Sequence, residues 1–218
     1  MRFSACCWLS LALASAVLAE EPSATPVQLT DVLERMASSS GVEVLFYERK
    51  ELALLVDPLE SAGVIYFASP DRFARFTLRP ASASLVVVGE EVRMREADGE
   101  VVDLTGNALA TVFVENFVVL WSGDRERLER IYTVEFRDEA PHWALRLVPR
   151  EKPLAGAIAA ITLTGDAKAM RKMVVEESDG DRTTTAFESM RSDRAFTPQE
   201  LERIFVVGEP LEGGSAGH

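Results

Sequence analysis

Hydrophobic and polar residues alternate along most of this chain, which is the pattern of half-buried β-strands. The alternation begins clearly at Val42, Val44 and Phe46, and it returns in short runs toward the C-terminal end. Turn-forming residues separate the runs, and Asp98-Gly99 and Asp179-Gly180 are dipeptides typical of two-residue hairpin turns. Short strands joined by tight turns pair in antiparallel order. The predicted strands, about eleven in number, cover residues 42–56, 63–68, 72–79, 83–88, 92–96, 101–104, 132–136, 143–148, 158–163, 171–176 and 182–187.

Helical spacing replaces this alternation at three places, where apolar residues recur at intervals of three and four. Thr30 is the expected N-cap of the first helix. Thr197-Pro198-Gln199-Glu200 has the N-cap, N1 proline and N3 glutamate of a capping box, which predicts a short helix after it. The predicted helices cover residues 29–40, 107–121, 124–131 and 201–206.

These elements predict an α+β fold that is mainly β. A long antiparallel meander favours one large, strongly curved sheet over two stacked sheets. Some runs, such as Val64-Ile65-Tyr66-Phe67, are apolar on both faces, so we expect helices to cover the concave face. We expect one domain over 20–207 and a disordered, Gly-rich tail over 208–218.

The N-terminal segment has the composition of a cleavable signal peptide. Arg2 is followed by an uncharged, Ala-rich apolar stretch that ends in small residues before Glu20. Residues 1–19 are therefore expected to be removed on export, leaving a soluble protein outside the cytoplasm. Cys6 and Cys7 both lie in this segment, so the mature chain is expected to lack disulfides and thiolates.

The composition argues against several classes of function. The chain has 23 basic and 35 acidic residues and a net charge of −12, which disfavours binding to nucleic acid or to anionic membranes. Only His142 and His218 are available as imidazoles, and there is no glycine-rich phosphate loop. Residues 213–217 match the nucleophile-elbow pattern but lie in the tail, without the required strand and helix. We therefore expect no catalytic site, no metal site and no cofactor.

The sequence is instead rich in large apolar side chains. For each one taken alone, a place in an ordinary core is the simpler interpretation. Taken together, they also suit a cavity for acyl chains, because an apolar pocket binds by removing ligand surface from water and needs no specific polar motif. The candidate cavity residues are Phe46, Ile65, Phe67, Phe73, Val86, Val88, Phe113, Phe117, Trp121, Trp143 and Leu145.

The order of elements and several motifs resemble the LolA-like family of periplasmic carriers of outer-membrane lipoproteins. The main motif is Gly63-x-Ile65-x-Phe67-x-Ser69-Pro70-Asp71-Arg72-Phe73, an alternating strand that ends in a Pro-x-x-Phe turn. Leu128-x-x-x-Tyr132-x-Val134 and Trp143-x-Leu145-x-Leu147-x-Pro149 agree with later segments. The resemblance covers about residues 28–190.

The resemblance implies an incomplete barrel with a helical lid over an apolar cavity, in a likewise periplasmic and monomeric protein. Such a carrier takes the acyl chains of a lipoprotein from an inner-membrane transporter and delivers them to an outer-membrane acceptor. In the family, a basic residue before the proline holds the lid shut, whereas this chain has Ser69 there. Lid control and cargo are therefore expected to differ, with Arg75 or Arg79 as candidates to compensate.

Three functions remain open at this stage. The first is a carrier of lipoproteins, or of a related glycolipid or polyene lipid. The second is a regulatory module that senses lipid or misfolded protein and signals through a partner. The third is an enzyme with a carboxylate site in the same cavity, for which Glu48 and Glu115 are the candidates.

Overall fold

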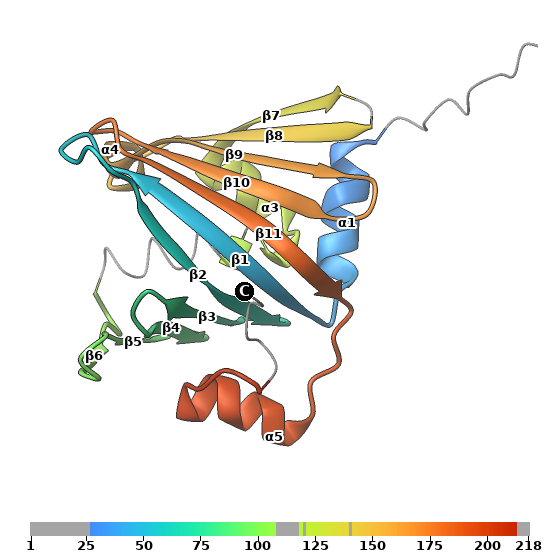
Figure 1. Cartoon of the computed structure of the whole chain (residues 1–218). Coiled ribbons are helices and arrows are strands. Elements are labelled where there is room, and N and C mark those ends of the chain that lie inside the picture. The colour runs from blue at the N-terminus through green and yellow to red at the C-terminus, as the bar shows by residue number, and fades with distance from the viewer. Residues whose placement is uncertain (1–26, 108–117, 120, 140, 213–218) are drawn as a thin grey trace, which may run out of the picture.

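The computed structural model describes residues 27–107, 118–119, 121–139 and 141–212. Within this part of the chain, eleven strands form one antiparallel sheet in the order β6-β5-β4-β3-β2-β1-β11-β10-β9-β8-β7 (Figure 1). The predicted fold class is therefore confirmed. The strands are β1 Gly41–Glu51, β2 Leu59–Ala68, β3 Arg72–Arg79, β4 Ala83–Val88, β5 Glu91–Arg95, β6 Val101–Asp103, β7 Tyr132–Glu139, β8 His142–Pro149, β9 Ile158–Asp166, β10 Met170–Glu177 and β11 Arg182–Ser192.

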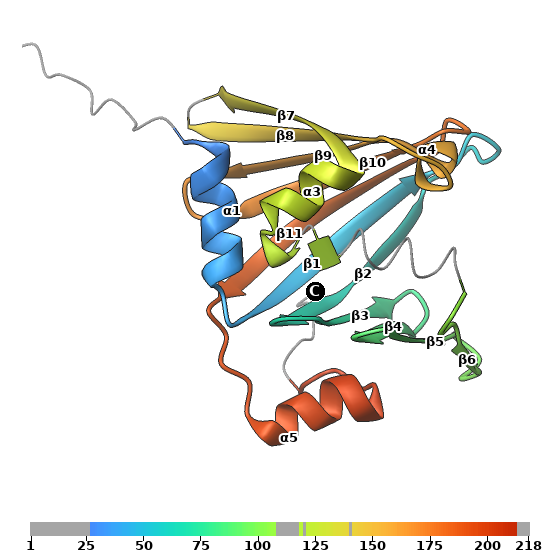
Figure 2. The same ribbon diagram turned by 180° about the vertical axis from the view of Figure 1, so that it is seen from behind.

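Two meanders meet in the middle of this sheet. β1 pairs with β11 along nearly its whole length, from Val42 opposite Ser192 to Glu51 opposite Arg182. β6 and β7 are the two edges, so the curled sheet is an incomplete barrel (Figures 1 and 2). The register of β1 against β11 shifts between Glu43 and Leu45, where Ser189 has a positive φ of 48°. Such a bulge increases the local twist and bends the strand.

The helices lie on both faces of the sheet. Figure 2 shows α3 inside the curl, with α1 across the ends of the central strands and α5 on the opposite side of β3 and β4. We call the side of α1 and α3 the inner face and the side of α5 the outer face. The helical elements are α1 Leu29–Ser38, α3 Arg125–Ile131, α4 Leu154–Ala157, α5 Pro198–Leu201 and a π-helical turn, η1, Glu202–Val207.

The helix ends follow the sequence signals closely. The predicted capping box is present, since Thr197 N donates to Glu200 Oε2 at 2.8 Å and Glu200 N donates to Thr197 Oγ1 at 3.3 Å. Asp124 caps α3 by accepting a 3.0 Å hydrogen bond from Arg127 N. α1 begins one residue before the expected cap Thr30, because Gln28 is its N-cap.

Some boundaries differ from the prediction. The strand expected over 42–56 ends at Glu51, and a turn follows. Of the helix expected over 107–121, residues 118, 119 and 121 are helical and residue 107 is not, while 108–117 and 120 lie outside the described residues. Residues 208–212 continue beyond the expected domain boundary, and Leu211 N donates to Tyr66 Oη at 3.2 Å on the outer face.

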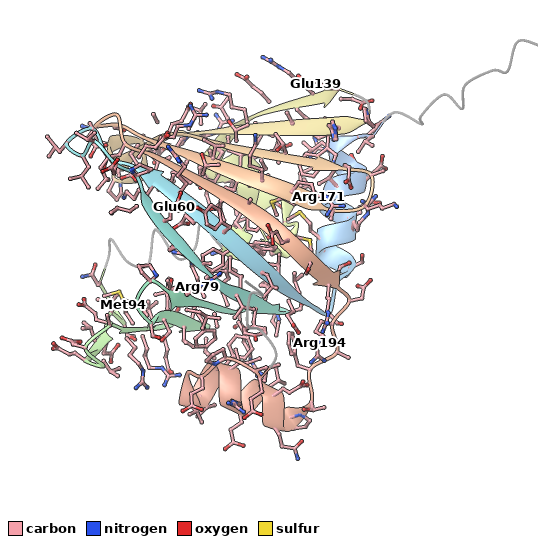
Figure 3. All side chains as sticks on the ribbon, in the orientation of Figure 1. Glu60, Arg79, Met94, Glu139, Arg171 and Arg194 are labelled. Atoms are coloured by element: carbon pink, nitrogen blue, oxygen red, sulfur yellow. The ribbon has the colours of Figure 1, made fainter. Side chains whose placement is uncertain are left out.

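The sheet buries apolar side chains on both faces. Along β2, Ile65 and Phe67 join the inner cluster, whereas Val64 and Tyr66 join a second cluster with Ile204 and Phe205 of η1. Arg194 connects this C-terminal segment to the sheet through Glu43 Oε2 at 3.2 Å and Glu200 Oε1 at 2.5 Å (Figure 3). The two-sided apolar pattern of β2 thus reflects two cores.

Candidate functional site

The inner face gathers most of the predicted cavity residues into one buried cluster. Strand side chains alternate between faces, so every second residue of β1, β2 and β3 points toward α1 and α3. The cavity candidates that the structure brings together there are Phe46, Ile65, Phe67, Phe73, Trp121, Trp143 and Leu145.

The remaining four candidates are not in this group. Val86 and Val88 pack in the outer cluster beneath η1, so their placement in a common inner cavity is corrected. In β4 the inner positions are Leu85 and Val87. Phe113 and Phe117 lie outside the described residues.

Gly63 explains why a glycine belongs in the β2 motif. A Cβ at this position would lie 1.9 Å from the Phe76 carbonyl oxygen and 2.9 Å from the Phe46 ring. The missing side chain therefore lets β3 and the Phe46 ring approach β2 closely. The residue lies inside β2 rather than at its start.

The inner face is covered by α1, by residues 118–119 and 121–122, and by α3. The Trp121 ring meets the Phe187 ring edge to face, with centroids 5.6 Å apart. Gly123 has a φ of +68°, and a Cβ there would lie 2.2 Å from the Leu33 carbonyl oxygen of α1. α1 therefore packs directly against the turn that precedes α3.

Two pockets open beside α1. The α1 pocket, between α1 and the sheet, has a cavity volume of about 50 Å³, and its lining includes Val32, Met36, Val42, Trp121, Trp143, Met170 and Met190. The turn pocket, between α1, the β2–β3 turn and the start of α3, has a volume of about 410 Å³, within the usual range of ligand sites. Its lining is more polar than that of the α1 pocket and includes Met36, Phe67, Ser69, Asp71, Val118, Ser122, Asp124 and Arg127. Met36 and Ser39 line both pockets, so the end of α1 separates them.

A polar group interrupts the apolar inner face. Arg75 donates to Glu48 Oε1 at 2.8 Å, and its guanidinium lies 4.5 Å from the centroid of the Phe46 ring. Thr185 Oγ1 donates to Glu48 Oε2 at 3.0 Å. Both oxygens of Glu48 thus have partners, and Arg75 pairs with the sheet rather than with Ser69.

Other contacts hold α1 in place against the sheet and α3. The Arg35 guanidinium donates to the Ala167 carbonyl oxygen in the β9–β10 turn. Arg125 of α3 donates to Thr30 Oγ1 at 3.4 Å. Ser69, the position expected to differ from the family, donates its backbone N–H to the Ser40 carbonyl oxygen at 3.2 Å. The basic residue that connects α1 with the sheet is therefore on the helix, which the sequence motif did not indicate.

Tyr132 is a polar feature that sequence reasoning treated only as an aromatic residue. Its side chain is fully buried in the inner cluster, and its hydroxyl has no hydrogen-bond partner among the residues that the structure describes. Burial raises the pKa of the Tyr132 hydroxyl well above its usual value, so this group is a neutral donor.

Comparison with known families gave a match over most of the chain. Residues 21–204 match a family described as outer membrane lipoprotein carrier protein LolA-like. A comparison with curated proteins gave no match. Among the described residues, no helix combines the length and apolarity that a membrane span requires.

Three solved structures illustrate the likeness. A DUF1329 family protein from Desulfovibrio piger is 13% identical, with a TM-score of 0.49 and coverage of 81% of this chain and 94% of that chain. A LolA superfamily protein from Nitrosomonas europaea is 10% identical, with a TM-score of 0.43 and coverage of 82% and 97%. The MucA/MucB complex from Pseudomonas aeruginosa matches at 16% identity, with a TM-score of 0.46 and coverage of 79% of this chain and 60% of that chain.

Proposed function

Since this chain belongs to the LolA-like family of outer membrane lipoprotein carrier proteins, we propose that it is a soluble periplasmic carrier of acyl chains. The cargo is a lipoprotein or a related lipid or glycolipid, which the protein moves from the inner to the outer membrane. An inner-membrane transporter and an outer-membrane acceptor are its partners. The observation that carries the proposal is the apolar inner face, which is covered by helices, with two pockets that meet at Met36.

Acyl-chain burial supplies the binding energy in this proposal. Each methylene removed from water contributes about 0.8 kcal/mol, so ten buried methylenes contribute about 8 kcal/mol before other costs. The α1 pocket is small, at about 50 Å³, so α1 must move for a chain to enter there. Apart from the hydrogen bonds of Arg35 and Thr30, the contacts that α1 loses are made by buried apolar side chains such as Val32 and Leu33. An acyl chain can replace these apolar contacts with contacts of the same kind.

Arg35 takes the role of the lid latch in this proposal. It connects α1 to the Ala167 carbonyl oxygen and lines the α1 pocket. Arg75, the residue first considered for this role, already has Glu48 and the Phe46 ring as partners. The latch thus reaches from the helix to a turn of the sheet, instead of from the sheet to the helix.

A carboxylate enzyme in this cavity has little support. Glu48 is held by Arg75 and Thr185, and Glu115 lies outside the described residues. We assign no catalytic step to the protein.

A binding assay with a fluorescent fatty acid tests the carrier proposal. We expect saturable binding to the wild-type protein that is displaced by unlabelled palmitoyl lipid. Met36→Trp should fill the junction of both pockets and weaken binding at least tenfold. Val206→Trp is the matched control, because Val206 is exposed on η1, and it should bind as the wild type does. Equal binding by all three proteins would place the ligand elsewhere, and no binding by the wild type would contradict the carrier function.

The alternative is a periplasmic regulatory module that senses lipid in the same cavity. The exposed apolar turn between β1 and β2 favours a protein partner and is compatible with both functions. The two can be separated by lipid transfer between donor and acceptor vesicles. A carrier accelerates transfer, whereas a sensor binds lipid without accelerating it.

A further inference from the structure

Two tyrosines are fully buried, one on each face of the sheet. Tyr66 lies in the outer cluster, and its hydroxyl accepts a hydrogen bond from Leu211 N at 3.2 Å. Tyr132 lies in the inner cluster, and its hydroxyl has no partner among the described residues. A buried polar group without a partner is costly and rare in folded proteins. The buried, unpartnered hydroxyl of Tyr132 therefore needs a functional explanation, whereas the hydroxyl of Tyr66 already has a partner.

The position of Tyr132 connects it with the helices that cover the inner face. It is the first residue of β7 and follows α3 directly, and Leu128 of α3 is buried in the same cluster. Trp121, which lines the α1 pocket, also belongs to this cluster. The hydroxyl is thus a donor within the buried cluster of the inner face. Tyr132 lines neither the α1 pocket nor the turn pocket, so an acyl chain must displace part of this cluster to reach it.

We propose that the Tyr132 hydroxyl donates a hydrogen bond to the carbonyl oxygen of the ester or amide that links the acyl chain to the cargo. This inference rests on the proposed carrier function. A neutral phenol suits a neutral carbonyl oxygen, whereas a phosphate or carboxylate would favour a cationic partner. The cargo class is then an acylated molecule bound at its linkage, and not a plain hydrocarbon.

Two ligands that differ only at the carbonyl test this assignment. 1-Palmitoylglycerol has an ester carbonyl, and 1-O-hexadecylglycerol has the same chain length without it. We expect the full-length wild-type protein to prefer the ester about three- to tenfold, the range of one neutral hydrogen bond. Tyr132→Phe should abolish this preference and leave binding of the ether unchanged. The ligand-free variant should be at least as thermally stable as the wild type, because it loses an unpartnered hydroxyl.

Tyr66→Phe is the matched control and should retain the ester preference. An undiminished preference in Tyr132→Phe would overturn the inference while leaving the carrier function in place. Failure of the wild type to bind either ligand would contradict the carrier function itself.

A second inference comes from the turn between β1 and β2, residues 52–58, together with Leu59. We call this segment the apolar tip. Leu54 is 97% exposed and Val56 is 100% exposed, while Leu55 and Leu59 are about half exposed. The backbone N–H of Ala53 donates a hydrogen bond to Asp181 Oδ1 at 2.8 Å, which connects the tip to the β10–β11 turn. Figures 1 and 2 show both turns at the end of the sheet that carries α4.

The tip is surrounded by negative charge. Asp57 lies within it, Glu51 and Glu60 flank it, and Figure 3 shows Glu60 toward the same end of the sheet. Carboxylate oxygens of Glu177, Asp179 and Asp181 lie within 4.8 Å of one another in the adjacent turn. The nearby cations Arg49 and Lys50 pair with Glu51 at 3.3 Å and Glu177 at 3.0 Å. Arg182 lies opposite Glu51 in the β1–β11 register, and the acidic residues here still outnumber the basic ones. An anionic bilayer or a second copy of this acidic chain would be repelled.

We infer that the apolar tip docks into an apolar cleft of a protein partner whose rim carries lysine and arginine. Apolar anchors surrounded by charge are typical of specific protein interfaces. The acidic surroundings add electrostatic attraction, so association should be fast at low salt and slower at high salt.

Photo-crosslinking in cells tests this docking. A crosslinking amino acid at Leu54 should capture a protein that is not captured from Val206, an exposed apolar position on the outer face. The purified partner should bind the wild type at least tenfold more tightly than a Leu54→Ser, Val56→Ser variant, and its association rate should fall with added salt. Three outcomes would each overturn the inference. The first is crosslinking to lipid together with binding to phosphatidylcholine vesicles, the second is crosslinking between copies of this chain, and the third is equal capture from both positions.

Discussion

Gly63 shows how one residue determines the shape of the site. Its Cα hydrogen faces the Phe76 carbonyl oxygen and the Phe46 ring at distances that no Cβ can occupy. Sequence reasoning identified this glycine through its motif, but the reason for it is a close approach between strands. A pattern of residue types does not contain that distance, so only the structure could explain it.

Gly63→Ala should therefore lower the free energy of unfolding. Overpacking of this kind costs about 1–3 kcal/mol, and here the obstacle is backbone, which cannot rotate away. Gly156→Ala is the control, because nothing lies within 4 Å of a Cβ at that glycine. Urea denaturation should show a lower midpoint for Gly63→Ala only, and equal midpoints would show that the two strands can separate without cost.

Asp166 gives a prediction about acid stability. Burial alone would raise the pKa of this carboxyl, but hydrogen bonds from Lys168 N, Arg171 and Ala169 N outweigh burial and lower its pKa to about 2. Because the folded pKa lies below the unfolded value, the ionised carboxylate stabilises the fold above about pH 4. This stabilisation is lost as the pH falls from about 4 to 2. Asp166→Asn should be less stable than the wild type at neutral pH. It should also lose less stability than the wild type between about pH 4 and pH 2. Thermal unfolding measured over a series of pH values tests both expectations. Identical slopes for both proteins would contradict this role.

At the scale of elements, α1 is the movable part of the site. It separates the two pockets, and Arg35 connects it with the β9–β10 turn that Asp166 stabilises. The 3.6-residue periodicity predicted this helix, but periodicity alone does not indicate which turn a long side chain reaches. The same limit explains why Val86 and Val88 were assigned to the inner cavity by mistake. All residues from Leu85 to Val88 are apolar, and an uninterrupted apolar run does not show which side chains face the inner cluster and which face the outer one.

Arg35→Met should loosen α1 while retaining the apolar part of the side chain. An exposed contact of this kind contributes about 0.5–1 kcal/mol, so global stability should change little. Hydrogen exchange within 29–38 should increase severalfold, and the fluorescent fatty acid should associate faster. Glu34→Gln, an exposed change on the same helix, should leave both rates unchanged. Unaltered exchange in Arg35→Met would exclude the latch.

At the scale of the whole molecule, the sheet separates two cores with different roles. Turn signals and alternation were sufficient to predict the strand number and the antiparallel pairing of consecutive strands within each half, because every connection there is local. They did not predict that β1 pairs with β11 or that β6 and β7 are the edges, because this pairing joins residues far apart in sequence. They were not sufficient to predict that residues 198–212 cover the outer face. That contact depends on chain segments far apart in sequence, such as Tyr66 and Leu211.

Deletion of residues 198–218 should expose Val64, Tyr66 and Phe76 on the outer face. These side chains are buried under η1, so their exposure should destabilise the fold by several kcal/mol, at about 25 cal/mol per Å² of apolar area, and promote aggregation. Size-exclusion chromatography and thermal unfolding measure both effects. A fully soluble, equally stable truncated protein would show that the outer cluster does not need its helical cover.

Native mass spectrometry of the exported protein, purified without detergent, tests the carrier function most directly. The account predicts a population with the mass of one acylated molecule added, which Met36→Trp reduces and Val206→Trp does not. A spectrum that shows only the unliganded protein, together with no binding of palmitoyl lipids added afterwards, would contradict it.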